Sequence, residues 1–149
     1  MPVCRLDGKR GAMIPDPMIP DPLSVSPDQT AVFSVTDSDG RLAAAIYRHS
    51  EPVFAEAGVF AVVVTVDGDL DMDVAVPLEQ ILHQALGSGM LVCCDLEHTG
   101  YFGAAGARVA LSAARRAADA DAVFVLRGVR GMSRRVLEAI NFDQSMIIK

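Results

Sequence analysis

The chain has 149 residues, of which 51% are hydrophobic and 21% charged, and its formal net charge is −6. This length and apolar content suffice for a buried core and exclude a wholly disordered chain, while the acidic balance argues against a nucleic-acid-binding protein. No apolar run reaches the roughly 20 residues of a membrane span, no signal peptide is recognisable, and three cysteines do not make a disulfide framework, so a cytoplasmic protein is expected.

Residues 1–30 differ from the rest of the chain in their proline content. The segment MIPDPMIPDP, residues 13–22, is a tandem five-residue repeat, and six of the eight prolines lie within the first 27 residues. Proline removes a backbone donor and fixes φ, so an extended or disordered segment is expected. The predicted organisation is a flexible N-terminal extension over residues 1–30, followed by one domain over residues 31–149.

The first predicted elements of the domain are strands. AVFSVT (31–36) and RLAAAIYRH (41–49) flank DSDG (37–40), whose Asp-Gly pair suits a tight turn, so a hairpin is expected. VFAVVVTV (59–66) is a nearly continuous β-branched run, typical of a strand buried on both faces. This strand should end at DGDLD (67–71).

The apolar period changes from Val74 onward. Four residues recur at the spacing of an amphipathic helix: Leu78, Ile81, Leu82 and Ala85. Pro77 is expected in the first turn of this helix, where proline is tolerated. The GSG at residues 87–89 should end the helix.

The remaining elements continue this alternation. Apolar runs at 90–96 and 122–128 predict two more buried strands, and an alanine-rich helix is expected between them over residues 104–120. A last helix is expected over residues 133–140, with Ser133 as its cap and Asn141 as the left-handed residue after it. Residues 145–148 suit a short edge strand.

The order of elements from residue 59 predicts an α/β fold, in which one mixed sheet has its helices packed on one side. The N-terminal hairpin would then cover the other face of the sheet.

Charged residues are unevenly distributed. Residues 1–90 carry 5 basic and 13 acidic side chains, whereas residues 91–149 carry 8 and 6. The C-terminal part could therefore present a basic face, although a solvated helix surface is the favoured interpretation. The arginines concerned are Arg108, Arg115, Arg116, Arg127, Arg130, Arg134 and Arg135.

The acidic cluster DGDLDMD, residues 67–73, could bind Ca²⁺ or Mg²⁺, but it lacks the glycine and distal glutamate spacing of an EF-hand loop. A solvated turn with acids at a helix N-terminus is the favoured interpretation.

Cys93 and Cys94 are adjacent on a strand, so they should point to opposite faces and pack as small hydrophobic residues, whereas Cys4 should be exposed. No metal or cofactor is expected.

No nucleophile–base set, phosphate-binding glycine loop or Cys-x-x-Cys motif is present, so the chain is not expected to be an enzyme. The three histidines also lack metal-ligand spacing.

Three segments in this order resemble the STAS domain of bacterial anti-sigma-factor antagonists. VTVDGDLDMDVAVPLEQIL is similar to that family's strand, turn and first helix. MLVCCDLEHTGYFGAAGARVAL is similar to the strand that leads into its Asp-Ser-Ser/Thr-Gly turn, and SRRVLEAINF to its last helix. The resemblance covers residues 43–148. It implies a protein that binds a kinase-type anti-sigma factor and thereby releases a sigma factor, until the kinase phosphorylates the first serine of the turn.

Carried onto this chain, the four positions of that turn fall on Gly103, Ala104, Ala105 and Gly106. Only the last matches the family, and Ala104 has no oxygen to phosphorylate. The resemblance thus implies a partner-binding surface that is not switched at the usual turn. The residues expected on it are Asp71, Thr99, Tyr101, Gly103, Ala104, Ala105, Gly106 and Arg108.

Three alternatives remain open. Thr99 and Tyr101 are the hydroxyls nearest the turn and could serve as other phosphosites. The same fold could instead sense a small ligand or nucleotide, with the basic helix face binding an anion. A redox-responsive module that uses the cysteines is the third.

Overall fold

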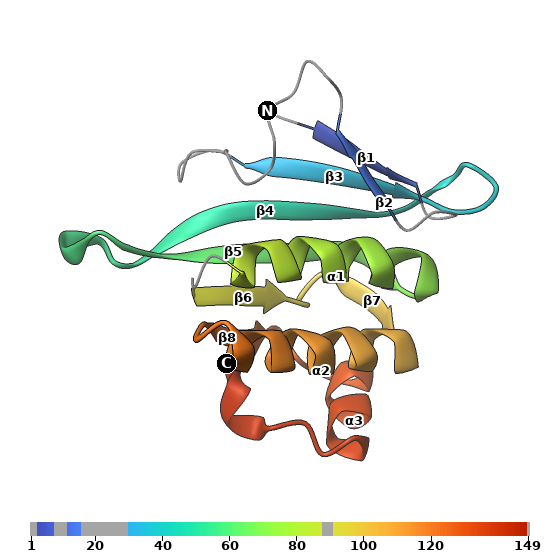
Figure 1. Ribbon diagram of the computed structural model, residues 1–149. Helices are drawn as coiled ribbons and strands as arrows, with labels where there is room; N and C mark the ends of the chain where they lie inside the picture. Colours follow the sequence, from blue (N-terminus) through green and yellow to red (C-terminus); the bar gives the residue numbers. More distant parts are fainter. Residues whose placement is uncertain (1–2, 8–11, 16–29, 88–90, 149) are drawn as a thin grey trace.

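The computed structural model describes residues 3–7, 12–15, 30–87 and 91–148, with side chains described from residue 30 onward except those of Phe54 and Ala55 (Figure 1). The strands are β1 (Val3–Asp7), β2 (Ala12–Pro15), β3 (Ala31–Thr36), β4 (Leu42–Phe54), β5 (Val59–Leu70), β6 (Leu91–Asp95), β7 (Thr99–Phe102), β8 (Val123–Arg127) and β9 (Ile147–Ile148). The helices are α1 (Met72–Leu86), α2 (Ala104–Asp119) and α3 (Met132–Ala139), with short 3-10 turns η2 (Ala55–Ala57) and η3 (Gln144–Met146).

The described strands form one mixed sheet in the order β2-β1-β3-β4-β5-β6-β8-β9, and β7 pairs with the end of β5. The β3–β4 and β4–β5 pairs are antiparallel, whereas β5–β6, β6–β8 and β8–β9 are parallel. Parallel neighbours need a crossover, which α1 and α2 supply on the same face of the sheet (Figure 1). The predicted α/β fold, a mixed sheet with helices on one side, is confirmed.

The sequence suggested that the N-terminal hairpin, β3 and β4, covers the other face of the sheet. This prediction is wrong, because the hairpin is part of the sheet itself. Strand β4 pairs along β5 from Ala44↔Gly68 to Phe54↔Val59, so the hairpin extends the sheet within its own plane. This pairing satisfies the backbone groups along one edge of β5, which a stacked hairpin would have left unpaired.

The core lies between the sheet and the helices. Alternate strand residues face the helices, and Phe33, Ile46, Val64, Cys94 and Phe124 are all at most 2% exposed there. The helices contribute a stripe of small and branched residues to the same cluster: Leu78, Ile81, Leu82, Ala85, Val109, Ala110, Ala113 and Ala117. The many alanines of α2 allow it to lie close to the sheet and to α1.

Helix α1 begins earlier than the apolar period indicated. The Asp71 carboxylate accepts hydrogen bonds from the amides of Asp73 (3.0 Å) and Val74 (3.3 Å), which caps a helix that starts at Met72. Pro77 is therefore the sixth helical residue and lies in the second turn, so its expected place in the first turn was wrong. The helix ends at Leu86, before Gly87, while the following residues 88–90 lie outside the described part of the chain.

The last helix also starts one residue early. Gly131 is its N-cap, and Ser133 lies inside the first turn, where its hydroxyl accepts from the Arg130 amide at 3.1 Å and donates to the Arg130 carbonyl at 2.9 Å. Ser133 thus fastens the preceding loop and is not the cap that the sequence suggested. Asn141 has a φ of +57°, so the predicted left-handed residue after the helix is confirmed.

Within the predicted N-terminal extension, β1 and β2 are described as strands at the β3 edge of the sheet. Most of the proline repeat and the side chain of Cys4 lie outside the described residues. The boundary at residue 30 stays a prediction.

Candidate functional site

Strand β5 continues past its expected end, and this continuation builds the edge where α1 and α2 begin. Gly68 makes it possible: its φ is +133°, and a Cβ there would lie 2.9 Å from the carbonyl oxygen of Ala43 on the neighbouring strand. Beyond it, β5 pairs with β7 at Gly68↔Thr99 and Leu70↔Phe102. The last pair leaves the N-terminal ends of α1 and α2 side by side (Figure 1).

The turn that starts α2 is built from residues without hydrogen-bonding side chains. Gly103 is the N-cap in an extended conformation, and no side chain caps the helix. A Cβ at Gly103 would collide with the ring of Tyr101, and one at Gly106 would lie 2.7 Å from the Phe102 ring. The two glycines therefore let aromatic rings pack against the helix start, and Ala104 is left exposed between them.

The hydroxyls nearest the turn have different surroundings. Thr99 is partly buried, and its Oγ1 donates to the carbonyl of Val66 at 3.1 Å. Tyr101 is 51% exposed, and its amide donates to Asp69 Oδ1 at 2.8 Å. Of the two alternative phosphosites, Tyr101 is the more exposed, although its hydroxyl lies against Gly103.

The structure thus gathers most of the predicted site residues at one edge. Asp71 caps α1 beside the turn, Ala105 is half-buried, and Arg108 is exposed one turn along α2. The acidic cluster is used locally: Asp69 holds β7 and Asp71 caps α1, as the interpretation of a turn with helix-terminal acids requires.

Exposed apolar side chains surround this edge, which the sequence alone did not indicate. Met72 begins α1 and is 75% exposed, and Met132 begins α3 and is 53% exposed. Both follow the carboxyl ends of parallel strands, as does Tyr101. We call the surface formed by Asp71, Met72, Tyr101, Ala104, Arg108 and Met132 the α2-start surface. It combines accessible apolar area with few charges, a composition suited to contact with another protein.

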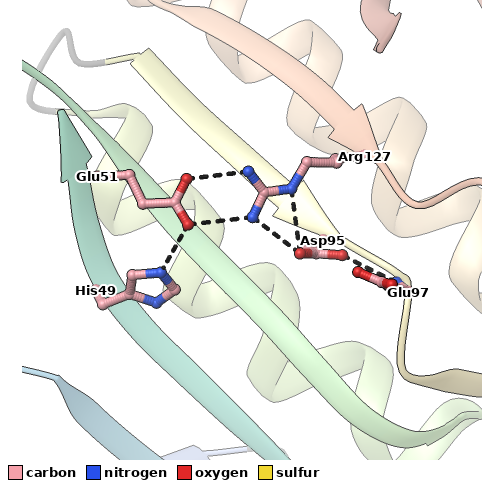
Figure 2. A network of polar contacts seen from close by, with 5 residues as sticks. All are labelled: His49, Glu51, Asp95, Glu97 and Arg127. Carbon is pink, nitrogen blue, oxygen red and sulfur yellow. Dashed lines mark hydrogen bonds and ion pairs between the residues drawn. The ribbon is translucent and has the colours of Figure 1, made fainter. Parts of the chain in front are cut away.

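A second polar constellation lies on the sheet face opposite the helices (Figure 2). Arg127 donates from Nε and Nη2 to Asp95 Oδ2 at 3.1 and 2.9 Å, and from Nη1 and Nη2 to the two Glu51 oxygens at 3.0 and 3.3 Å. His49 lies 3.1 Å from Glu51, and Asp95 also accepts from the Glu97 amide at 2.9 Å. The guanidinium thereby ties β8 to β6 and, across β5, to β4.

The electrostatics of this network are those of a structural ion cluster. The hydrogen bond from Arg127 holds the pKa of the Glu51 carboxyl at about 2, below its usual 4.5. The same hydrogen bond raises the pKa of Arg127 above its ordinary value, so each partner stabilises the charged form of the other. Sequence reasoning missed the cluster because Glu51 and Arg127 are 76 residues apart.

Cys93 and Cys94 are both buried and point to opposite faces, as predicted. Burial raises the pKa of Cys93 to about 11, with nearby Arg127 opposing the shift, and burial also raises the pKa of Cys94. Neither thiol has the depressed pKa of a reactive cysteine, so the redox alternative has no support from this pair.

The arginines of the expected basic face lie in four separate places. Arg127 belongs to the ion cluster, Arg130 donates to the Glu97 carbonyl at 2.9 Å, and Arg134 and Arg135 are exposed on α3. The other three arginines, Arg108, Arg115 and Arg116, line one hollow between α1 and α2.

Within the described part of the chain, no helix is both long enough and apolar enough to cross a membrane.

The comparisons with known proteins agree with this architecture. A family model described as "Mlab, STAS domain" matches residues 55–149. No curated protein sequence matches the chain. The solved structure of an anti-sigma factor antagonist from Mycobacterium paratuberculosis is 18% identical with a TM-score of 0.55, over 76% of this chain and 89% of the other. The Bacillus cell fate determinant SpoIIAA, solved in its phosphorylated form, is 16% identical with a TM-score of 0.52, over 68% and 88%. At these identities the likeness concerns the fold.

Proposed function

The chain belongs to the STAS-domain family, and from that premise we propose that it is a regulator of the anti-sigma-factor-antagonist type. In this proposal it binds a kinase-type anti-sigma factor, and this binding releases a sigma factor. The main observation in support is the α2-start surface, whose centre at Ala104 carries only a methyl group and corresponds, by the sequence resemblance, to the family's switch turn.

The composition of this surface favours a persistent contact. Met72 and Met132 offer flexible apolar side chains that adapt to a partner, and Tyr101 offers a half-exposed aromatic ring of the kind that anchors interfaces. Ala104 lies between them with only a methyl group. A partner that approaches closely would bury this methyl group without having to desolvate a polar atom.

Regulation would differ from that of a switchable antagonist. Phosphorylation adds about −1.5 to −2 charge at an interface, and Ala104 has no atom that can accept a phosphoryl group. ATP should therefore leave the complex intact. If regulation has moved to a neighbouring hydroxyl, Tyr101 is the better candidate, because Thr99 is committed to the Val66 carbonyl.

The test uses the full chain to capture partners, followed by titration of the purified kinase-type ATPase with wild type and variants. Ala104→Glu should weaken binding more than tenfold, about 1.4 kcal/mol, because it places an unpaired carboxylate in the contact. Ala118→Glu is the matched control, since Ala118 is also an exposed alanine of α2 but lies at the other end of the helix. Equal affinities for wild type and Ala104→Glu would remove the α2-start surface from the interface.

A second variant tests the lost switch. The double change Gly103→Asp and Ala104→Ser restores an acid and a phosphorylatable hydroxyl, and it requires the Tyr101 ring to swing outward, which its exposure permits. Binding of this variant should become sensitive to ATP and Mg²⁺, whereas wild type should stay bound. Release of wild type by ATP, with phosphate mapped to Tyr101, would contradict the proposal of a constitutive antagonist.

A further inference from the structure

A hollow of about 570 Å³ lies between α1 and α2, and Arg108 is the one residue that it shares with the α2-start surface. Its lining residues are Glu79, His83, Arg108, Leu111, Ser112, Arg115, Arg116 and Asp119. We call it the interhelix groove. Its volume falls within the roughly 300–1,000 Å³ of small-molecule sites.

The acidic side chain on the α1 wall of the groove is already engaged. Ser112 Oγ donates to Glu79 Oε1 at 2.6 Å, and His83 Nε2 lies 2.9 Å from the same hydroxyl. Since the serine hydroxyl has one proton and gives it to Glu79, it accepts from His83, which places the histidine proton on Nε2. Glu79 is thus held by the serine and is not paired with an arginine.

The guanidinium groups of the groove are the unusual feature. Arg108, Arg115 and Arg116 are exposed, and among the described residues none of them has a carboxylate or carbonyl partner. The contrast with Arg127 and Arg130, which are both engaged, is clear. The hollow is lined by these three cations and by two carboxylates, Glu79 and Asp119, so it has an excess of positive charge in a chain whose net charge is −6.

The spacing of these groups defines what they could hold. Arg115 and Arg116 are adjacent, and Arg108 lies seven residues earlier on the same helix, about 10 Å along its axis. Leu111 provides an apolar patch between the two positions. Guanidinium groups pair with phosphate through parallel hydrogen bonds. We propose that the interhelix groove binds a small phosphate-bearing anion, with its phosphate at Arg115 and Arg116 and its remaining part along Leu111 toward Arg108.

The experiment is isothermal titration calorimetry of the full chain at about 50 mM salt, where screening of exposed charges is moderate. The probes are AMP, inorganic phosphate, adenosine and citrate. We expect saturable binding of AMP, no binding of adenosine, and weaker binding of citrate, because its carboxylates share the charge but not the geometry of phosphate. If inorganic phosphate binds as tightly as AMP, the groove recognises the phosphate group and not the nucleoside. This result would also support the proposal.

The variant Arg115→Ala/Arg116→Ala should lose at least tenfold in affinity for AMP. The control Arg134→Ala/Arg135→Ala removes the same charge from exposed positions on α3 and should bind like wild type. Circular dichroism verifies that both variants fold. The proposal would be overturned if neither AMP nor phosphate bound saturably up to about 10 mM, a dissociation constant that corresponds to a binding free energy of about −2.7 kcal/mol. Equal losses in the two variants, or citrate binding as tight as AMP, would overturn it as well.

Discussion

Replacing Arg127 with methionine should destabilise the domain more than any other surface substitution described above. The change keeps an apolar stem on β8 but removes four hydrogen bonds to Asp95 and Glu51. The two acceptors differ in burial, since the side chain of Asp95 is 9% exposed and that of Glu51 is 40% exposed. Their contributions should differ accordingly.

The larger part of the cost comes from Asp95. Without Arg127 its carboxylate keeps only the Glu97 amide as a partner and becomes a nearly buried charge without compensation. Breaking a buried pair in this way costs about 3–5 kcal/mol, and the partial exposure of Arg127 places the value near the lower end. The Glu51 half adds at most about 1 kcal/mol, because that pair is screened by solvent. We expect a total loss of about 3–4 kcal/mol.

The pH dependence separates the two halves. The folded pKa of Glu51, about 2, is depressed below its usual 4.5, so its contribution is complete above pH 4.5 and is lost as the pH falls toward 2. The stability difference between wild type and Glu51→Gln should therefore shrink across that window. A difference that stays constant over it would contradict the assignment of the ion pair.

The assay is urea unfolding followed by far-UV circular dichroism for wild type, Arg127→Met and Arg127→Met/Asp95→Asn. The double variant removes the uncompensated charge and should be more stable than Arg127→Met alone by more than about 1 kcal/mol. Thiol labelling in a Cys4→Ser background gives an independent measure, because Cys93 lies beside the cluster. Loss of Arg127 removes the cation that opposes the raised pKa of Cys93, so labelling of Cys93 should slow relative to that of Cys94, which faces the helices. The reasoning is refuted if Arg127→Met unfolds within about 0.5 kcal/mol of wild type.

Three further outcomes are expected. Asp71→Ala should lower the unfolding free energy by about 1 kcal/mol through loss of the α1 cap, whereas Asp73→Ala, measured in the same urea series, should change it by less than half as much. Gly128→Ala should cost about 2 kcal/mol or more, because its φ is +73° and a Cβ would lie 2.5 Å from a backbone nitrogen, while Gly131→Ala, with a φ of +57° but open space, should cost less. Limited proteolysis should cut first within residues 1–30 and leave a stable core, and protection of that range equal to the central strands would move the domain boundary.

The elements that could be predicted from the sequence are those for which a local pattern of apolar residues is enough to assign a strand or a helix. The apolar runs of β5 and β6 are largely buried on both faces, whereas β8 is buried on the face toward the helices, and each run was recognisable without knowledge of its neighbours. The alanine-rich helix α2, which begins after Gly103, was predicted from its sequence in the same way. The continuation of β4 beyond His49 was not predicted, because Ser50 to Pro52 are polar or proline and are strand only through their pairing with β5.

The candidate site was predictable by resemblance but not from local chemistry. The short strand β7 has no apolar period of its own, and it exists because β5 continues through Gly68 and offers it an edge. The ion cluster and the interhelix groove each combine side chains from elements far apart in sequence. One clue was available: Asp95 and Arg127 both lie near the ends of predicted strands, and the structure makes these strands parallel neighbours, so that the opposite charges meet.

The placement of the Arg127 cluster bears on how fast the domain unfolds. The β4–β5 hairpin joins residues close in sequence, so we expect it to form early, whereas β8 must dock across a 32-residue separation, from Val92 to Phe124. A guanidinium that bridges β8 to β4 can form its bonds only after that late docking step. Interactions absent from the folding transition state slow unfolding without changing the folding rate. We therefore expect the cluster to lengthen the lifetime of the folded domain without changing how fast it folds.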